Sequence, residues 1–128
     1  MGQLTAQQLN ALSVQFREIA NTILDYRIAH PLLPADDADL EMLQNSILDS
    51  ATALATQSAI QAGSEAAEAI KTLINVTGEI KTTIKGLENV TKVINIAAAV
   101  LKVAVCLTKV DFGGIKNGVK DLVDSLKN

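Results

Sequence analysis

The chain has 128 residues, of which 48% are hydrophobic and 20% charged, and its formal net charge is −3. This length predicts a single domain spanning residues 1–128, because an independent core needs about 100 residues. Seven glycines and two prolines exclude disordered and collagen-like chains, and one cysteine excludes an internal disulfide. Only 2% of the residues are aromatic, so the apolar content is mainly Ala, Leu, Ile and Val, which favours helices.

Charge is distributed unevenly along the chain. Residues 1–70 hold two basic and nine acidic side chains, a net charge of −7, whereas residues 71–128 hold nine lysines and five acids, a net charge of +4. We expect the two halves to face each other in the fold or to address different partners. Lysines without interleaved aromatic residues argue against a nucleic-acid partner. The first residues lack a secretory signal peptide, which predicts a cytoplasmic protein or export by a signal-independent route.

An apolar seam with alternating spacings of three and four residues predicts a first helix from Thr5 to about Ala29. The seam consists of Leu9, Leu12, Phe16, Ile19, Ile23 and Tyr26. Thr5 followed by Gln8 has the form of a capping box at the start of this helix. His30 and Pro31 end it, because a proline disfavours helical geometry in the residue before it.

A second helix is predicted to begin near Asp36 or Asp37 and to end near Gln61, with a break at Gly63 and Ser64. Its apolar stripe consists of Leu40, Leu43, Ile47, Ala51 and Leu54. The acidic cluster at its start lacks the central glycine and the bidentate acid of a calcium-binding loop. We therefore interpret Asp36, Asp37, Asp39 and Glu41 as residues that cap the helix and complement its dipole.

A heptad pattern begins near Glu65 and continues into the second half of the chain without a slip in register. Its a and d positions are Ile70, Leu73, Thr77, Ile80, Ile84, Leu87, Thr91, Ile94, Ala98, Leu101, Val105 and Thr108. One unbroken helix over this span would be about 70 Å long, which exceeds the reach of the two preceding helices. We therefore expect a turn between Gly86 and Asn89 that makes two helices of the span.

The stretch from Val90 to Val110 is the most apolar part of the chain, with fifteen apolar residues among 21. This composition approaches that of a membrane-spanning helix, for which about 20 apolar residues suffice. On a helical projection the polar side chains, apart from Thr108, gather within an arc of about 100°. They are Glu88, Thr91, Lys92, Asn95, Lys102, Cys106 and Lys109. The alignment predicts a helix, because a strand would scatter the lysines over both faces.

A helix that is apolar over most of its circumference needs partners on nearly all sides. In one interpretation it is the central helix of the bundle, with a narrow polar stripe reaching solvent. In a second it moves into a bilayer or onto a partner protein, and in a third it forms a homo-oligomer interface. The residues expected to make the membrane or partner contact are Lys92, Val93, Ile96, Val100, Lys102, Val103, Leu107 and Lys109.

A short closing helix is predicted after a glycine turn at residues 111–114. Its apolar face consists of Ile115, Val119, Leu122, Val123 and Leu126. Gly118 weakens this helix by about 1 kcal/mol relative to alanine. The helix must therefore dock on the rest of the protein, and we expect it to cover the preceding apolar helix as a fixed or detachable lid.

No combination of residues predicts catalysis, a cofactor or a metal site. The single histidine, His30, lies beside Pro31 and far along the chain from Cys106, the single cysteine. Such a pair supplies too few ligands for a metal ion and does not by itself make a nucleophile and a base. We therefore do not expect an enzyme.

Together these patterns predict an all-α fold, an antiparallel four-helix bundle with a short fifth amphipathic helix at the C-terminus. The functional hypothesis is a non-enzymatic protein whose apolar helix at residues 90–110 engages membrane lipid, with pore or lesion formation after conformational release. The alternative is a soluble interaction, scaffold or adaptor protein that binds a partner protein and keeps that helix as its buried central core.

Overall fold

The computed structural model describes residues 2–4, 6–56, 60–62 and 64–127, and side chains at 8–56 and 68–127. The elements in chain order are β1 (Gly2–Leu4), α1 (Ala6–Ala29), α2 (Pro34–Ala55), β2 (Ile60–Ala62), α3 (Ser64–Gly86), α4 (Val90–Thr108) and α5 (Phe112–Lys127). The predicted all-α bundle with a short fifth helix is confirmed.

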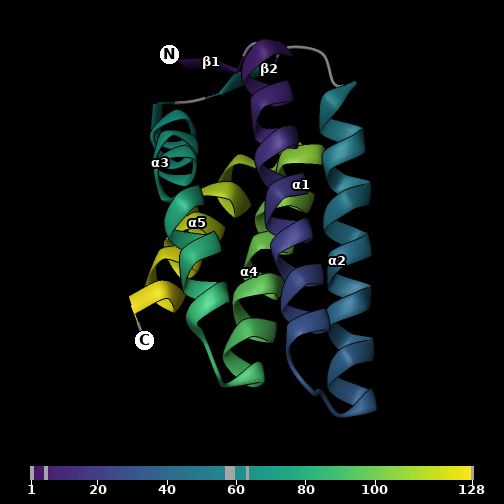
Figure 1. The fold of residues 1–128 in the computed structure, drawn as a ribbon. Coiled ribbons are helices and arrows are strands. Elements are labelled where there is room, and N and C mark those ends of the chain that lie inside the picture. The colour runs from purple at the N-terminus through teal and green to yellow at the C-terminus, as the bar shows by residue number, and fades with distance from the viewer. Residues whose placement is uncertain (1, 5, 57–59, 63, 128) are drawn as a thin grey trace.

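The five helices form a ring around one core, and consecutive helices run in opposite directions (Figure 1). Helix α1 packs against α2 and α3, α2 also packs against α4, and α5 packs against both α3 and α4. Helices α3 and α4 contact each other little although a short turn joins them, because α5 lies between them. Helix α5 is therefore a member of the ring, and the touching pairs α1–α3, α2–α4 and α3–α5 run in the same direction.

The predicted apolar seams of the first three helices form the core. All six seam residues of α1 and all five of α2 are buried, as are the heptad positions of α3 from Ile70 to Ile84. Burial of one such Leu, Ile or Phe side chain stabilises the fold by about 1.5–3 kcal/mol. Two buried hydroxyls of this core are paired: that of Ser13 donates to the Ala51 carbonyl oxygen, and that of Thr77 donates to the Leu73 carbonyl oxygen at 3.0 Å. The buried Tyr26 hydroxyl has no hydrogen-bond partner among the described residues.

The turn between α1 and α2 is held by an ion-pair cluster. The Arg27 guanidinium donates to the Asp37 carboxylate at 2.8 Å and to Glu41 at 3.0 Å, and it also donates to the Gln44 side-chain oxygen at 2.8 Å. Asp37 and Glu41 therefore join α2 to α1, which the capping interpretation did not include. Helix α2 starts earlier than predicted, at Pro34. Its N-cap residue is Leu33, which makes no side-chain capping hydrogen bond.

The connection from α2 to α3 differs from the prediction. Helix α2 ends at Ala55, and Ile60–Ala62 forms strand β2, which pairs with β1 in antiparallel register, Gly2 opposite Ala62 and Leu4 opposite Ile60. The antiparallel α1–α2 hairpin returns the chain to the end where α1 begins, so the two segments meet and satisfy each other's backbone groups. Thr5, the predicted capping residue, lies outside the described residues.

The two remaining turns lie on either side of α4. The predicted break at Gly86–Asn89 is confirmed: α3 ends at Gly86, and the Asn89 side chain accepts from the Thr91 N–H at 2.9 Å and caps α4. The predicted glycine turn at 111–114 is wrong. Val110, with φ of 57°, makes the turn, and α5 begins at Phe112 with Gly113 and Gly114 inside its first turn.

Candidate functional site

Helix α4 is, within the described part of the chain, the one helix long and apolar enough to cross a membrane, and 39% of its apolar stretch is buried. It packs against α2 and α5. It is therefore not the central helix of the bundle, which corrects the first interpretation of its composition. The side of α4 that turns away from the ring carries its exposed residues, which are Thr91, Lys92, Asn95, Ala98 and Lys102.

The polar stripe predicted along α4 is confirmed. Thr91, Lys92, Asn95, Lys102 and Lys109 are exposed, and Cys106 is half-buried. Lys102 lies 3.7 Å from the Asp121 carboxylate of α5, and both side chains are more than half exposed. A pair in this setting contributes little to stability. The stripe is thus an exposed edge of α4 that follows the α4–α5 boundary.

The apolar residues predicted to contact a membrane or a partner lie on the inner face of α4. Val93, Ile96, Val100, Val103 and Leu107 are all buried, with at most 2% of any side chain exposed. They pack in the common core together with Ala97 and Ala104. In this conformation the three predicted lysines are therefore exposed, whereas the five apolar residues become accessible only if α4 leaves its neighbours.

The heptad positions of α4 form a second apolar face, which the bundle does not fully bury. Ile94, Ala98, Leu101 and Val105 form a line that we term the outer stripe; Ala98 is exposed, and the other three are half-buried. These are the heptad positions that continue the buried seam of α3. The heptad register marked these positions in the sequence, but none of them was among the residues expected to contact a membrane or a partner. On α4 the bundle buries the opposite face instead.

Two glycines allow α5 to approach α4 closely. A β-carbon on Gly118 would lie 3.0 Å from Cγ2 of Val103, and one on Gly114 would lie 2.7 Å from Sγ of Cys106. Residues 114 and 118 are one helical turn apart and so share a face of α5. Gly118, which lowers the helix propensity of α5, thus lies in close contact with Val103 of α4.

Cys106 sits at this α4–α5 contact as a free, half-buried thiol. Burial raises its pKa above the usual value, and the nearby Asp111 carboxylate adds to the shift, while Lys102 and Lys109 oppose it. A thiol in this state is neutral near pH 7 and is a weak nucleophile. Its rate of modification therefore reports whether α5 is docked.

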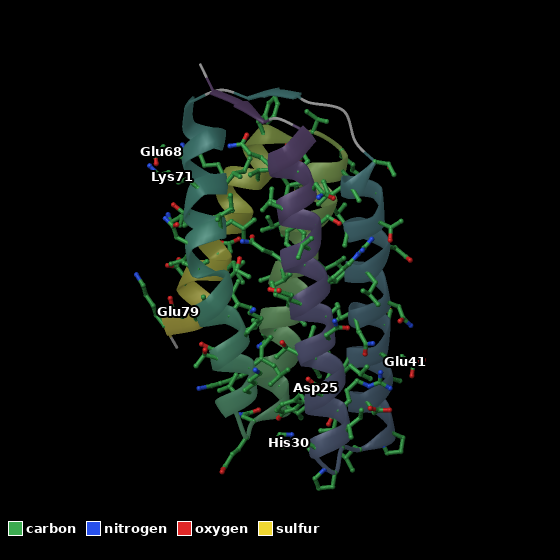
Figure 2. All side chains as sticks on the ribbon, turned by 45° about the horizontal axis from the view of Figure 1, so that its top comes forward. Asp25, His30, Glu41, Glu68, Lys71 and Glu79 are labelled. Atoms are coloured by element: carbon green, nitrogen blue, oxygen red, sulfur yellow. The ribbon has the colours of Figure 1, made fainter. Side chains whose placement is uncertain are left out.

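His30 and Lys81 each take part in a contact within the bundle. His30 lies at the end of the bundle formed by the α1–α2 turn (Figure 2), where its ring stacks on Tyr26 at 3.9 Å between centroids. Cys106 lies near the end of α4 that is furthest from this turn.

Lys81 of α3 bonds Glu18 of α1 at 2.9 Å and so joins the acidic and basic halves. Among the described residues no three His, Cys, Asp or Glu side chains are grouped to hold a metal ion.

Comparison with protein-family models, with curated proteins and with solved structures gives no match for this chain.

Proposed function

We propose that this protein is a non-enzymatic helical bundle that acts on membranes through α4. The observation that supports this proposal is the composition of α4: nineteen residues, long enough for a bilayer, with one narrow polar stripe and apolar side chains on both its inner face and its outer stripe. A helix that only completes a core needs one apolar face. The additional apolar surface of α4 suits contact with hydrocarbon.

Release of α5 from α4 is the step we propose for exposing the inner face. The turn between them holds Val110 in a left-handed conformation, which costs a β-branched residue about 1–2 kcal/mol. Two glycines lie at the contact and a third, Gly113, lies beside it, and each weakens α5 by up to about 1 kcal/mol relative to alanine. The turn before α5 is thus strained, and the glycines lower the helix propensity of α5. Helices α1 and α2, in contrast, each bury a continuous apolar seam.

A disulfide staple tests this step directly. A β-carbon on Gly118 would lie 4.0 Å from Cβ of Val103, which is within the range for a disulfide. The variant combines Val103→Cys and Gly118→Cys with Cys106→Ser, so that α5 is locked on α4 when oxidised and free when reduced. Variants with one of the two new cysteines serve as controls.

The assay measures dye release from, and flotation with, vesicles of phosphatidylglycerol and phosphatidylcholine at pH values from about 5 to 8. We expect wild-type protein and the reduced staple to bind the anionic vesicles and release dye, and the oxidised staple to do neither. Inactivity of the wild type throughout this range, or equal activity of the oxidised and reduced staple, would contradict the proposal.

The polar stripe offers a second probe. Lys102→Glu should weaken binding to anionic vesicles strongly, because a lysine near an anionic surface contributes about 1 kcal/mol and its reversal adds repulsion. Lys71→Glu, at an exposed position on the outer side of α3 (Figure 2), makes the same change in net charge. Equal effects of the two substitutions would mean that net charge, and not α4, governs binding.

The alternative is a protein-interaction or scaffold function in which α4 stays a structural helix. The burial of its inner face against α2 and α5 favours this reading. The interaction function predicts that vesicles stay intact with the wild type and that the oxidised staple keeps every activity of the protein. The vesicle experiment therefore distinguishes the interaction function from membrane action.

A further inference from the structure

The outer stripe of α4 has the spacing of a coiled-coil seam. Ile94 and Leu101 occupy d positions of the heptad, and Ala98 and Val105 occupy a positions, so the line advances by four, three and four residues. A 3.5-residue repeat of apolar side chains keeps facing a partner helix that winds around it. The small Ala98 at its centre permits a close approach. The inner face of α4 already contacts the bundle, so the stripe is available to another molecule.

The two flanks of the outer stripe carry opposite charge. On the α5 side the flank is the polar stripe, where Lys102 and Lys109 are exposed. On the other side lies α2, which packs against α4 and runs in the same direction. Helix α2 has five acidic residues and no basic one, and α4 has lysines and no acid. Asp39 and Asp49 are exposed on α2, whereas Asp37 and Glu41 pair with Arg27 of α1.

The charges beside the outer stripe are complementary between two copies only for one orientation of the two-fold axis. A two-fold axis parallel to α4 places the outer stripes of two copies against each other with both helices running the same way. It then sets the lysine flank of each copy over the acidic α2 of the other. A two-fold axis across the stripe would place like charges together. Isologous contacts of this kind are the commonest basis of homodimers.

We propose that the outer stripe is the dimer interface of this protein, occupied by a second copy in parallel orientation. The outer stripe from Ile94 to Val105 is about 17 Å long, at 1.5 Å per residue, so even with the α2 edge it makes a small interface. The dimer is therefore weak, and its population rises over protein concentrations of about 1 to 200 μM. The dimer proposal goes beyond the proposed membrane action, in which the same outer stripe would contact lipid.

Sedimentation velocity of Ala98→Lys tests the interface. The substitution places a charge on the two-fold seam at an exposed position, where it leaves the fold intact. Ala11→Lys is the matched control, because Ala11 is exposed on α1, a helix that packs mainly against α2 and α3. We expect a concentration-dependent dimer for wild type and Ala11→Lys, and at least a tenfold weaker dimer for Ala98→Lys. A wild type that stays monomeric, or a dimer insensitive to Ala98→Lys, overturns the proposal.

Cysteine cross-linking tests the orientation. Ile94→Cys and Val105→Cys are made separately with Cys106→Ser, and each is oxidised alone and as an equal mixture. In a parallel pair each variant forms a disulfide with its own kind. In an antiparallel pair residue 94 meets residue 105, so cross-links form in the mixture alone, which overturns the proposed symmetry.

The outcome is separable from that of the vesicle experiment. The Val103–Gly118 staple lies on the inner side of α4, so the oxidised staple should dimerise as the wild type does. If Ala98→Lys abolishes vesicle binding while the wild type is monomeric at every concentration, lipid is the occupant of the outer stripe and the dimer proposal fails. If the dimer forms and vesicles stay intact, membrane action fails and the dimer stands.

Discussion

Replacement of Gly114 by alanine tests how closely α5 must approach α4. The added β-carbon would lie 2.5 Å from Oδ2 of Asp111 and 2.7 Å from Sγ of Cys106, so something must move. The Asp111 carboxylate is the more flexible group, but its Oδ1 accepts the Gly114 N–H at 3.0 Å and caps the start of α5. Any shift that makes room for the methyl group therefore weakens the cap.

The expected magnitude follows from three contributions. Loss of an N-cap costs about 1 kcal/mol, and overpacking at a contact costs about 1–3 kcal/mol. Alanine returns up to about 1 kcal/mol of helix propensity. We expect Gly114→Ala to lower the free energy of unfolding by about 1–3 kcal/mol, or the melting temperature by roughly 3–10 °C in a domain of this size.

Gly113 provides the matched control. A β-carbon there would have Asp111 Oδ1 as its nearest atom at 3.9 Å, an ordinary contact, and residue 113 is exposed. Gly113→Ala should therefore stabilise the protein by up to about 1 kcal/mol. Urea unfolding followed by far-ultraviolet circular dichroism measures both variants. If Gly114→Ala is as stable as Gly113→Ala, residue 114 of α5 does not lie close enough to Cys106 of α4 to exclude a β-carbon.

Three further predictions concern single residues. Val110→Gly should raise the free energy of unfolding by about 1 kcal/mol, because glycine adopts the left-handed conformation without strain; unchanged or lower stability in urea would contradict this. Arg27 lowers the pKa of Asp37, so the folded protein binds that proton less readily than the unfolded chain does. The resulting stability is present above the usual pKa near 4 and is lost as the pH falls through the lower folded value; the urea midpoint should drop less between pH 7 and pH 3 in Asp37→Asn than in the wild type. The Cys106 thiol, with its raised pKa, should react with iodoacetamide at pH 7 at least tenfold more slowly than in urea; equal rates would mean that α5 does not cover it.

Much of the fold could be predicted from local pattern. The seams of α1 and α2 became the core because each helix has one apolar face, and a helix with one apolar face has one way to bury it. The turn at Gly86–Asn89 followed from length, since a 70 Å helix has no partner of its own size. The lysines of α4 share one edge because a 3.6-residue period places them there.

The features that the prediction missed depend on contacts between distant parts of the chain. The pairing of β1 with β2 arises only when the α1–α2 hairpin brings residues 2–4 and 60–62 to the same end of the bundle. The role of Gly118 becomes visible only beside Val103, and the strained turn at Val110 only once α5 is docked.

The sequence by itself determined that residues 90–108 form a helix with one polar edge, because periodicity is a local property. It did not determine which apolar face of that helix turns inward, because α4 is apolar on two sides and its heptad register favours the side that ended outside. The tertiary structure decided this. Helix α5 inserts between α3 and α4 and meets Val103 through Gly118, which turns Ile94, Ala98, Leu101 and Val105 toward the surface.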